Sequence, residues 1–220
     1  MMAEQKWNYG GAIDRFPIKE GETWRTEDGK GTLRVHDIYN PLPDFMYEAD
    51  MVIVDPPWNL SNVNTFYTKA DKKGEHKNTF HDFYEQIFKT LESIDPNIVY
   101  MEMGKQNVDK FAERFRQLYE YVQVWEVTYY NTQPCFFIRA SKIGETDIDF
   151  TGVDELKVIA KATEVEDYNI VADFVMGRGA VAVGAYEAGK KFVGTELNPK
   201  RLAVVKEKID KLGGKWKLEN

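Results

Sequence analysis

The chain has 220 residues, of which 43% are hydrophobic and 14% aromatic, and this is enough apolar material for one large domain with a full core. It holds no apolar run near the ~20 residues of a membrane-spanning helix, no apolar signal region at its start, and one cysteine, Cys135, which excludes an internal disulfide and a cysteine-based zinc site. We expect a cytoplasmic protein that contacts no membrane and holds no structural metal; because its net charge is −7, a nucleic-acid partner would require a local basic face.

Short apolar runs alternate with amphipathic helical patterns along most of the chain. Taken in chain order, the patterns predict a strand at 32–37, a strand at 50–55, a helix at 80–93, a strand at 97–103, a helix at 106–120, strands at 121–130 and 135–139, a helix at 154–163, a strand at 168–173, a helix at 179–189, a strand at 191–196 and a helix at 199–212.

This alternation predicts an α/β fold, in which a mostly parallel sheet carries helices on both faces. The consecutive strands 121–130 and 135–139 have no helix between them, which predicts an antiparallel hairpin at one edge of the sheet. The stretches 61–78 and 141–153 look irregular, so we expect loop insertions there. We interpret the whole chain as a single domain that starts with an N-terminal extension over 1–30.

A rigid corner follows the second predicted strand. In Asp55-Pro56-Pro57-Trp58 two prolines lock two φ angles and cannot donate backbone hydrogen bonds, so the strand must stop there. The corner carries one acid and one flat aromatic ring, which suits a site that grips a planar ring. In open parallel sheets ligands bind beyond the carboxyl ends of strands. The acids at such ends are Asp37, Asp55, Asp173 and Glu196.

The segment 172–199 has the pattern of a nucleoside site: strand, glycine turn, helix, strand, acid. Gly177 and Gly179 lack side chains, so the turn can approach a ligand closely, and the next helix offers free backbone N–H groups. Glu196 follows about 20 residues later, where an acid can accept hydrogen bonds from both ribose hydroxyls. The alternative interpretation is an ordinary α/β turn and a helix capped by Asn198. Because no third glycine follows, a cofactor without a pyrophosphate fits better than a dinucleotide.

The two motifs together, "VDPPWN" at 54–59 and "ADFVMGRGAVAVGAYEAGKKFVGTELNPKR" at 172–201, resemble those of the DNA amino-methyltransferases that use S-adenosylmethionine, the adenine-N6/cytosine-N4 family. The catalytic corner precedes the cofactor glycines, which is the permuted order of the beta group of this family. The resemblance covers roughly residues 30–212. It implies a Rossmann-like methyltransferase sheet, S-adenosylmethionine as cofactor and DNA as partner.

The resemblance also implies roles for individual residues. Asp55 and the main-chain carbonyl of Pro56 would accept hydrogen bonds from the exocyclic amine of the target base, and Pro57 would complete the rigid corner. Trp58 would stack on a base rotated out of the helix. The residues expected to bind the cofactor are Asp37 and Ile38 at the adenine, Glu196 at the ribose, Asp173, Gly177 and Gly179 at the methionine end, and Asn198 as a further contact.

The chain departs from the family pattern in the glycine turn. Phe174 and Val175 replace the usual proline and phenylalanine, and Arg178 and Ala180 replace the serine and threonine of the family's Gly-Ser-Gly-Thr. We therefore expect a weaker or reshaped cofactor site. This change motivates an alternative function, an inactive methyltransferase-like subunit that binds a partner, although the intact Asp-Pro-Pro-Trp corner argues against it.

The lead hypothesis for the activity is adenine-N6 methylation of DNA. An aspartate at the head of the corner favours adenine, whereas a serine is commoner in the cytosine-N4 enzymes of the family. Adenine-N6 methyltransferases of RNA also carry Asp-Pro-Pro-Trp, but they generally lack a glycine turn followed by "GTELNP". Methylation of RNA adenine and of cytosine-N4 in DNA therefore remain the alternatives.

The densest cationic cluster beside the corner contains Lys72, Lys73 and Lys77. We expect some of these lysines to contact phosphate; the alternative is a solvated loop, whose charge Asp71 and Glu75 dilute. Because the insertions are short, the protein is expected to read a short or loose sequence, or to take its specificity from a homodimer or a second subunit.

Overall fold

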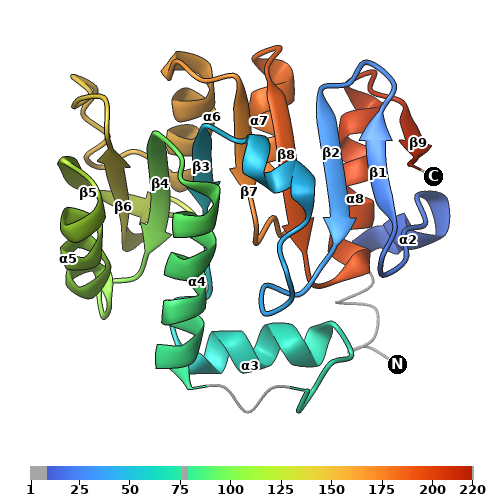
Figure 1. The fold of residues 1–220 in the computed structure, drawn as a ribbon, viewed down its shortest axis with the longest axis horizontal. Helices are drawn as coiled ribbons and strands as arrows, with labels where there is room; N and C mark the ends of the chain where they lie inside the picture. Colours follow the sequence, from blue (N-terminus) through green and yellow to red (C-terminus); the bar gives the residue numbers. More distant parts are fainter. Residues whose placement is uncertain (1–8, 76–78, 220) are drawn as a thin grey trace.

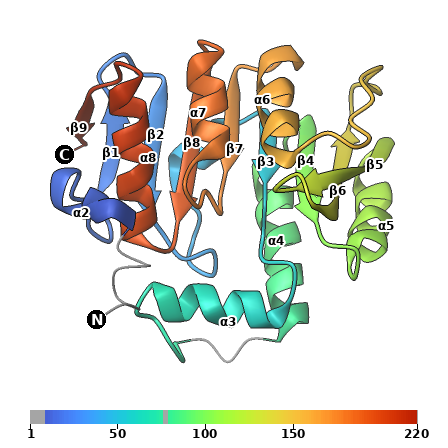
Figure 2. The same ribbon diagram turned by 180° about the vertical axis from the view of Figure 1, so that it is seen from behind.

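The computed structural model describes residues 9–75 and 79–219, and this part of the chain forms one nine-stranded sheet with helices on both faces (Figures 1 and 2). The strands are β1 (Thr23–Thr26), β2 (Gly31–Val35), β3 (Met51–Val54), β4 (Ile98–Met103), β5 (Tyr121–Tyr129), β6 (Gln133–Ser141), β7 (Ile170–Asp173), β8 (Lys191–Glu196) and β9 (Trp216–Leu218). The helices are η1 (Tyr9–Gly11), α2 (Ala12–Arg15), η2 (Asp44–Glu48), α3 (Leu60–Lys69), α4 (Phe80–Ile94), α5 (Val108–Leu118), α6 (Glu155–Val165), α7 (Ala180–Glu187) and α8 (Pro199–Lys211).

The strand order is β5-β6-β4-β3-β7-β8-β2-β1-β9. The five central strands, from β4 to β2, pair in parallel, whereas both edges are antiparallel. The predicted α/β fold, with its parallel centre and the antiparallel hairpin β5–β6, is confirmed. The second antiparallel edge, β1 with β9, was not predicted.

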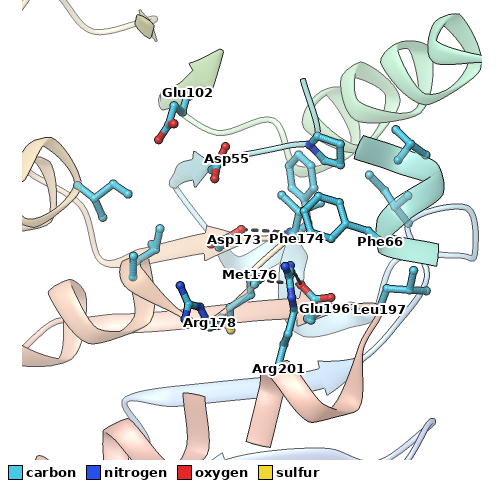
Figure 3. Close-up of a pocket in the computed structure, with 18 of the residues that line it drawn as sticks. Asp55, Phe66, Glu102, Asp173, Phe174, Met176, Arg178, Glu196, Leu197 and Arg201 are labelled. Carbon is cyan, nitrogen blue, oxygen red and sulfur yellow. Dashed lines mark hydrogen bonds and ion pairs between the residues drawn. The ribbon is translucent and has the colours of Figure 1, made fainter. Parts of the chain in front are cut away.

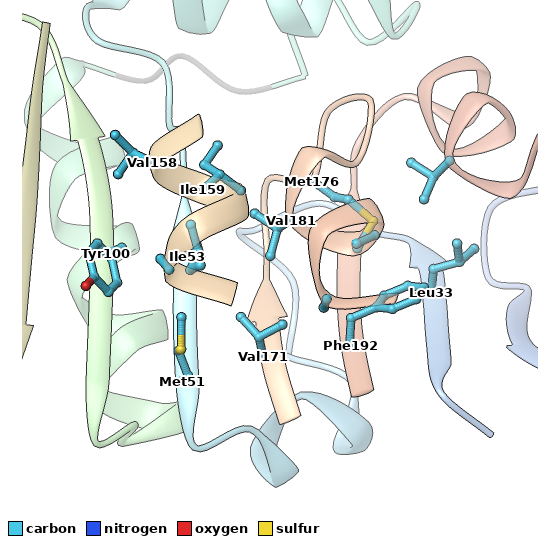
Figure 4. Packing of buried hydrophobic residues seen from close by; sticks show 14 of the residues in the cluster. Leu33, Met51, Ile53, Tyr100, Val158, Ile159, Val171, Met176, Val181 and Phe192 are labelled. Atoms are coloured by element: carbon cyan, nitrogen blue, oxygen red, sulfur yellow. The ribbon is translucent and has the colours of Figure 1, made fainter. Parts of the chain in front are cut away.

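The alternation of side chains along the central strands builds two hydrophobic cores, one on each face. In β3, Met51 and Ile53 face the core that α6, α7 and α8 cover, and Val52 and Val54 face the core under α4 and α5. Figure 4 shows Val158 of α6 among the residues of the first core. The cores fix the strands, and with them the strand ends on which the polar residues lie.

The stretch 61–78, which we predicted to be a loop, begins with the helix α3. Asn59 caps this helix, because its side-chain oxygen accepts a hydrogen bond from the Asn62 N–H at 2.9 Å. Val63 and Tyr67, four residues apart, form its buried face. The prediction was wrong here because the polar residues around these two apolar positions hide the helical spacing.

Helix α3 lies across the carboxyl ends of the central strands, at the bottom of Figure 1. The Tyr67 hydroxyl donates to Asp37 at 2.8 Å, and the Asn198 side chain donates to the Lys69 carbonyl at 2.9 Å. These contacts hold the helix over the sheet edge. In the part of the chain that the structure describes, no helix is long and apolar enough to cross a lipid bilayer.

Candidate active site

A cavity of about 420 Å³ lies between α3 and the carboxyl ends of the central strands (Figure 3). Its volume falls within the range of small-molecule sites. Each central strand brings one acid to its wall, and the sequence predicted all of these acids but one, Glu102. The five acids are Asp37 after β2, Asp55 after β3, Glu102 in β4, Asp173 in β7 and Glu196 in β8.

Asp55 stands where β3 meets the two prolines. Pro56 is buried and Pro57 lines the cavity beside it. The Asp55 side chain is exposed and faces the cavity, so solvent reaches its carboxylate. Desolvation by the neighbouring protein raises the pKa of Asp55; the hydrogen bond from Trp58 opposes the shift and the charge of Glu155 adds to it. Because solvent in an open cavity screens the carboxylate, we expect the full shift only when a ligand fills the cavity.

The Trp58 indole fixes the orientation of this carboxylate. Its Nε1 donates to Asp55 Oδ1 at 3.2 Å, and its ring packs edge-on against Tyr129 with the centroids 5.2 Å apart. Gly104 leaves room for the ring, because a Cβ atom at this position would lie 2.8 Å from an indole carbon. Asn107 holds the corner by donating to the Trp58 carbonyl at 2.7 Å. Stacking of Trp58 on a base stays a prediction.

Glu196 and the glycine turn form one hydrogen-bonded unit. The Gly177 N–H donates to Glu196 Oε2 at 2.7 Å, and the Asn198 N–H donates to Oε1 at 2.9 Å. Gly177 has a φ of 54°, in the left-handed region that favours glycine. Burial raises the pKa of Glu196, and Arg201, 3.9 Å away, opposes this shift. The backbone thus presents the carboxylate to the cavity in one orientation.

Two of the predicted cofactor residues make structural contacts. At Gly179 a Cβ atom would lie 2.8 Å from Cγ2 of Val205, so the glycine lets the turn pack on α8. Asn198 caps α8 by accepting a hydrogen bond from the Lys200 N–H at 2.9 Å and ties α8 to Lys69 through its amide nitrogen. The capping interpretation of Asn198 therefore describes its side chain, and contact of these two residues with a cofactor stays a prediction.

Asp173 lies at the centre of the acidic wall and is 5% exposed. The Val175 N–H donates to its Oδ1 at 3.1 Å. Burial raises the pKa of Asp173 well above 3.8, and the charges of Asp55 and Glu196 raise it further. Across residues 9–75 and 79–219, no three His, Cys, Asp or Glu side chains are grouped as a metal site requires. A positively charged organic group would relieve the repulsion between these acids.

The end of the cavity near β2 combines polar groups with apolar walls. Asp37 is 3% exposed and accepts hydrogen bonds from the Tyr67 hydroxyl and the Tyr39 N–H. Ile38 and Phe174 line the cavity nearby. Such walls suit a flat ring with polar edges.

Basic side chains lie beside the glycine turn. Arg178, which stands where the family has a serine, lines the cavity together with Arg201 and Lys208. The Arg201 guanidinium lies 4.4 Å from the ring centroid of Phe66, a cation–π distance. Lys208 donates to the Arg178 carbonyl at 2.9 Å and so supports the turn. With acids on one side and cations on the other, the cavity can hold a ligand that carries both charges.

Sequence reasoning missed several residues of the cavity wall. Phe66 was missed with its helix, and Tyr129 lies in the strand predicted at 121–130, for which no role in the site was expected. Glu155 accepts a hydrogen bond from the Tyr130 N–H at 3.0 Å, between segments that are distant in the sequence. Glu102 had a recognisable signal, since it is an acid inside a strand of otherwise apolar character.

The predicted phosphate-binding lysines follow α3. Lys72 forms ion pairs with Glu20 at 2.8 Å and with Glu75 at 3.7 Å, so its charge is partly neutralised within the protein. Lys73 is exposed, and Lys77 lies outside the described residues. A contact of these lysines with DNA stays a prediction.

Comparison with solved structures shows that this is the fold of DNA methyltransferase structures. The M1.HpyAVI–SAM complex matches with a TM-score of 0.57 at 14% identity, over 81% of this chain and 98% of that one. TTHA0409 from Thermus thermophilus, a candidate DNA modification methylase complexed with S-adenosyl-L-methionine, matches with 0.56 at 13%, over 81% and 93%. The cytosine-N4-specific PvuII DNA methyltransferase matches with 0.52 at 11%, over 84% and 89%. Comparisons with protein-family models and with curated protein sequences gave no match.

Proposed function

We propose that this protein transfers a methyl group from S-adenosylmethionine to the exocyclic amine of a base in DNA. The observation that carries the proposal is the position of Asp55, which faces the same cavity as the glycine turn and Glu196. A group that can orient an amine and groups that can hold a nucleoside therefore meet in one cavity. The two structural neighbours that were solved with S-adenosylmethionine support the choice of cofactor.

The residues of the cavity fit this cofactor. Glu196 would accept hydrogen bonds from the ribose hydroxyls, and Ile38 with Phe174 would enclose the adenine. Asp173 would face the ammonium and sulfonium charges, and Arg178 the carboxylate. S-adenosylmethionine supplies an electrophilic methyl group on its sulfonium sulfur.

The chain's own contribution to the reaction is orientation and proton acceptance. Asp55 would accept a hydrogen bond from the amine, which directs the nitrogen lone pair to the methyl carbon. As the nitrogen–carbon bond forms and the carbon–sulfur bond breaks, the nitrogen must lose one proton. Asp55 can accept that proton and release it to solvent, because desolvation by the bound ligands raises its pKa.

We infer that adenine-N6 is the target, because an aspartate heads the corner. Cytosine-N4 is the second candidate, since one structural neighbour is cytosine-N4-specific. Both bases carry an amine next to a ring nitrogen, so both present the same group to Asp55.

Product analysis tests the proposal and separates its alternatives. Purified protein would be incubated with tritiated S-adenosylmethionine and either unmethylated DNA or RNA, and the product would be digested to nucleosides and separated. We expect label in N6-methyldeoxyadenosine. Label in N4-methyldeoxycytidine would show that the target base is cytosine. Label in RNA alone would show that the substrate is RNA. Thermal stabilisation by S-adenosylmethionine without transfer to either would indicate the inactive binding subunit.

A further inference from the structure

Glu102 is an acid in a strand that is otherwise built of core residues. All six residues of β4 are buried, and Glu102 itself is 1% exposed. Its Oε1 atom is buried and lacks a hydrogen-bond partner among the residues that the structure describes, yet the side chain lines the cavity. A buried polar atom without a partner is costly to the fold, so its presence in a cavity wall points to a partner that is a ligand.

The sheet places Glu102 directly beside Asp55. In the parallel register of β3 and β4, Val54 pairs with Met101, and one further step along both chains brings Asp55 next to Glu102. Neighbouring strands lie about 4.8 Å apart, and Figure 3 shows both carboxyl groups at the same end of the cavity. One planar ligand can therefore meet both carboxyl groups.

The surroundings of Glu102 favour its neutral form. Burial raises the pKa of Glu102, and the negative charges of Asp55 and Glu155 raise it further, while the Cys135 thiol opposes the shift. A neutral carboxyl group donates one hydrogen bond through its O–H, whereas an ionised one only accepts. Glu102 thus offers a hydrogen-bond donor beside the acceptor oxygens of Asp55.

We propose that Glu102 contacts the target base and donates a hydrogen bond to the ring nitrogen that adjoins the amine held by Asp55. This nitrogen is N1 in adenine and N3 in cytosine. Proteins read flipped bases by hydrogen bonds to the Watson–Crick edge. On this edge the amine would donate to Asp55, and the unprotonated ring nitrogen would accept from Glu102. On its Watson–Crick edge, guanine carries a hydrogen on N1, so the donor of Glu102 would meet another donor there. Glu102 is therefore a specificity-determining residue, and this role rests on the proposed function.

The test compares the wild type and two variants of Glu102 on two target bases, and it measures the rate of single-turnover methyl transfer. Glu102→Gln keeps a donor of the same size, and Glu102→Val fills the site without one. The DNA carries adenine or 1-deazaadenine at the target position, or cytosine and 3-deazacytosine if product analysis identifies cytosine. The wild type should lose about tenfold in rate with the deaza base, the effect of one hydrogen bond. Glu102→Val should lose about tenfold with the normal base and nothing further with the deaza base, while Glu102→Gln should stay within about threefold of wild type.

Two controls make the result decisive. Glu102→Val removes a buried unpaired acid, so its thermal midpoint should equal or exceed that of the wild type, which excludes misfolding as the cause of a lower rate. For an adenine target, 7-deazaadenine keeps N1 and should show the same loss of rate, if any, in the wild type and in Glu102→Val. If 1-deazaadenine lowered the rate of the wild type and of Glu102→Val by the same factor, the proposed contact would be wrong, and the proposed function would stand. Absence of transfer by the wild type to unmodified DNA would overturn both.

Discussion

At the scale of single residues, the acids of the cavity wall fall into two groups, those that backbone N–H groups orient and those that they do not. Glu196 has a backbone N–H on each of its two oxygens, and Asp173 has one on Oδ1. Asp55 is oriented by the indole of Trp58, and Glu102 has an oxygen without a partner among the described residues. The backbone-held acids suit constant contacts with a cofactor, whereas the other two acids are placed to contact a substrate.

Replacement of Asp55 by Ala should abolish methyl transfer and leave cofactor binding largely unchanged. The reason is that Asp55 orients the amine in the proposed reaction, while the proposed cofactor contacts come from other strand ends. We expect a loss of rate on the order of 100-fold or more, measured with tritiated methyl groups. Asp109→Asn, which changes an exposed acid of α5, is the matched control and should keep full activity. Near wild-type transfer by Asp55→Ala would show that the catalytic assignment is wrong.

Replacement of Glu196 by Ala should weaken cofactor affinity by at least about tenfold, because the variant cannot make the two charge-assisted hydrogen bonds that we propose to the ribose. The variant also frees the N–H groups of Gly177 and Asn198, so Glu196→Gln, which keeps one acceptor oxygen, should lose less. Calorimetry with S-adenosylhomocysteine measures both affinities, with Glu187→Ala on the exposed end of α7 as control. Unchanged affinity in Glu196→Ala would remove this residue from the cofactor site.

The stability of the protein should depend on pH through Glu102. The groups that face this side chain are Asp55, Glu155, Asp154 and Cys135, and the sum of burial and charge raises its pKa in the folded state above the 4.5 of a free glutamate. The folded state therefore retains a proton that the unfolded state loses, and its stabilising effect, complete below pH 4.5, fades as pH rises toward the folded-state pKa.

Glu102→Gln does not titrate and removes this dependence. Between about pH 5 and about pH 8 the free energy of unfolding of the wild type should fall relative to that of Glu102→Gln by up to about 1.4 kcal/mol per pH unit. Urea denaturation at several pH values measures the difference between the two proteins. A constant difference across this range would show that Glu102 is ionised in the folded state.

At the scale of elements, the helices and strands with strong apolar periodicity were predicted within a few residues of their observed ends, and the weakly patterned ones were missed. Strands β1 and β9 have four and three residues, so their positions depend on pairing with each other and with β2. The local sequence pattern does not predict such pairing. The same limit applies to α3, whose apolar side chains complete the cavity wall.

The segment after α3 should carry part of the DNA affinity. Each phosphate contact adds nearly one unit to the slope of log affinity against log salt, so alanine at Lys72, Lys73 and Lys77 should flatten the slope by up to ~2–3 units. Because Lys72 is paired with Glu20 and Glu75, Lys73→Ala alone should flatten it more than Lys72→Ala. Fluorescence anisotropy across a salt series measures the slopes.

Lys217→Ala on β9, an edge strand of the sheet, is the control for this series and should leave the slope unchanged. Equal slopes of log affinity against log salt for the wild type and the triple variant would show that the three lysines are a solvated surface. The phosphate contacts would then have to be sought elsewhere.

At the scale of the whole molecule, the sheet explains why distant motifs could be assigned to one site before the fold was known. The corner at Asp55 and the acid at Glu196 are 141 positions apart in the sequence (196 minus 55), but parallel strands bring their carboxyl ends to one edge. What the motifs could not reveal is the contribution of residues that lie outside them. Glu102, an acid in an apolar strand, belongs to the cavity because of strand register. Phe66 belongs to it because of the placement of α3.

Helix α3 also connects the two ends of the cavity. It starts directly after the Asp-Pro-Pro-Trp corner, and its last carbonyl is held by Asn198 at the start of α8. Cofactor and base should therefore bind with positive cooperativity, and thermodynamic reciprocity requires that each raise the other's affinity by the same factor, about fivefold or more. Asn198→Ser keeps a good helix cap but lacks the amide donor to Lys69, so it should reduce this factor toward one while each ligand still binds alone. Calorimetry with S-adenosylhomocysteine in the presence and absence of DNA measures the factor, and an unchanged value in Asn198→Ser would show that the two ends communicate by another route.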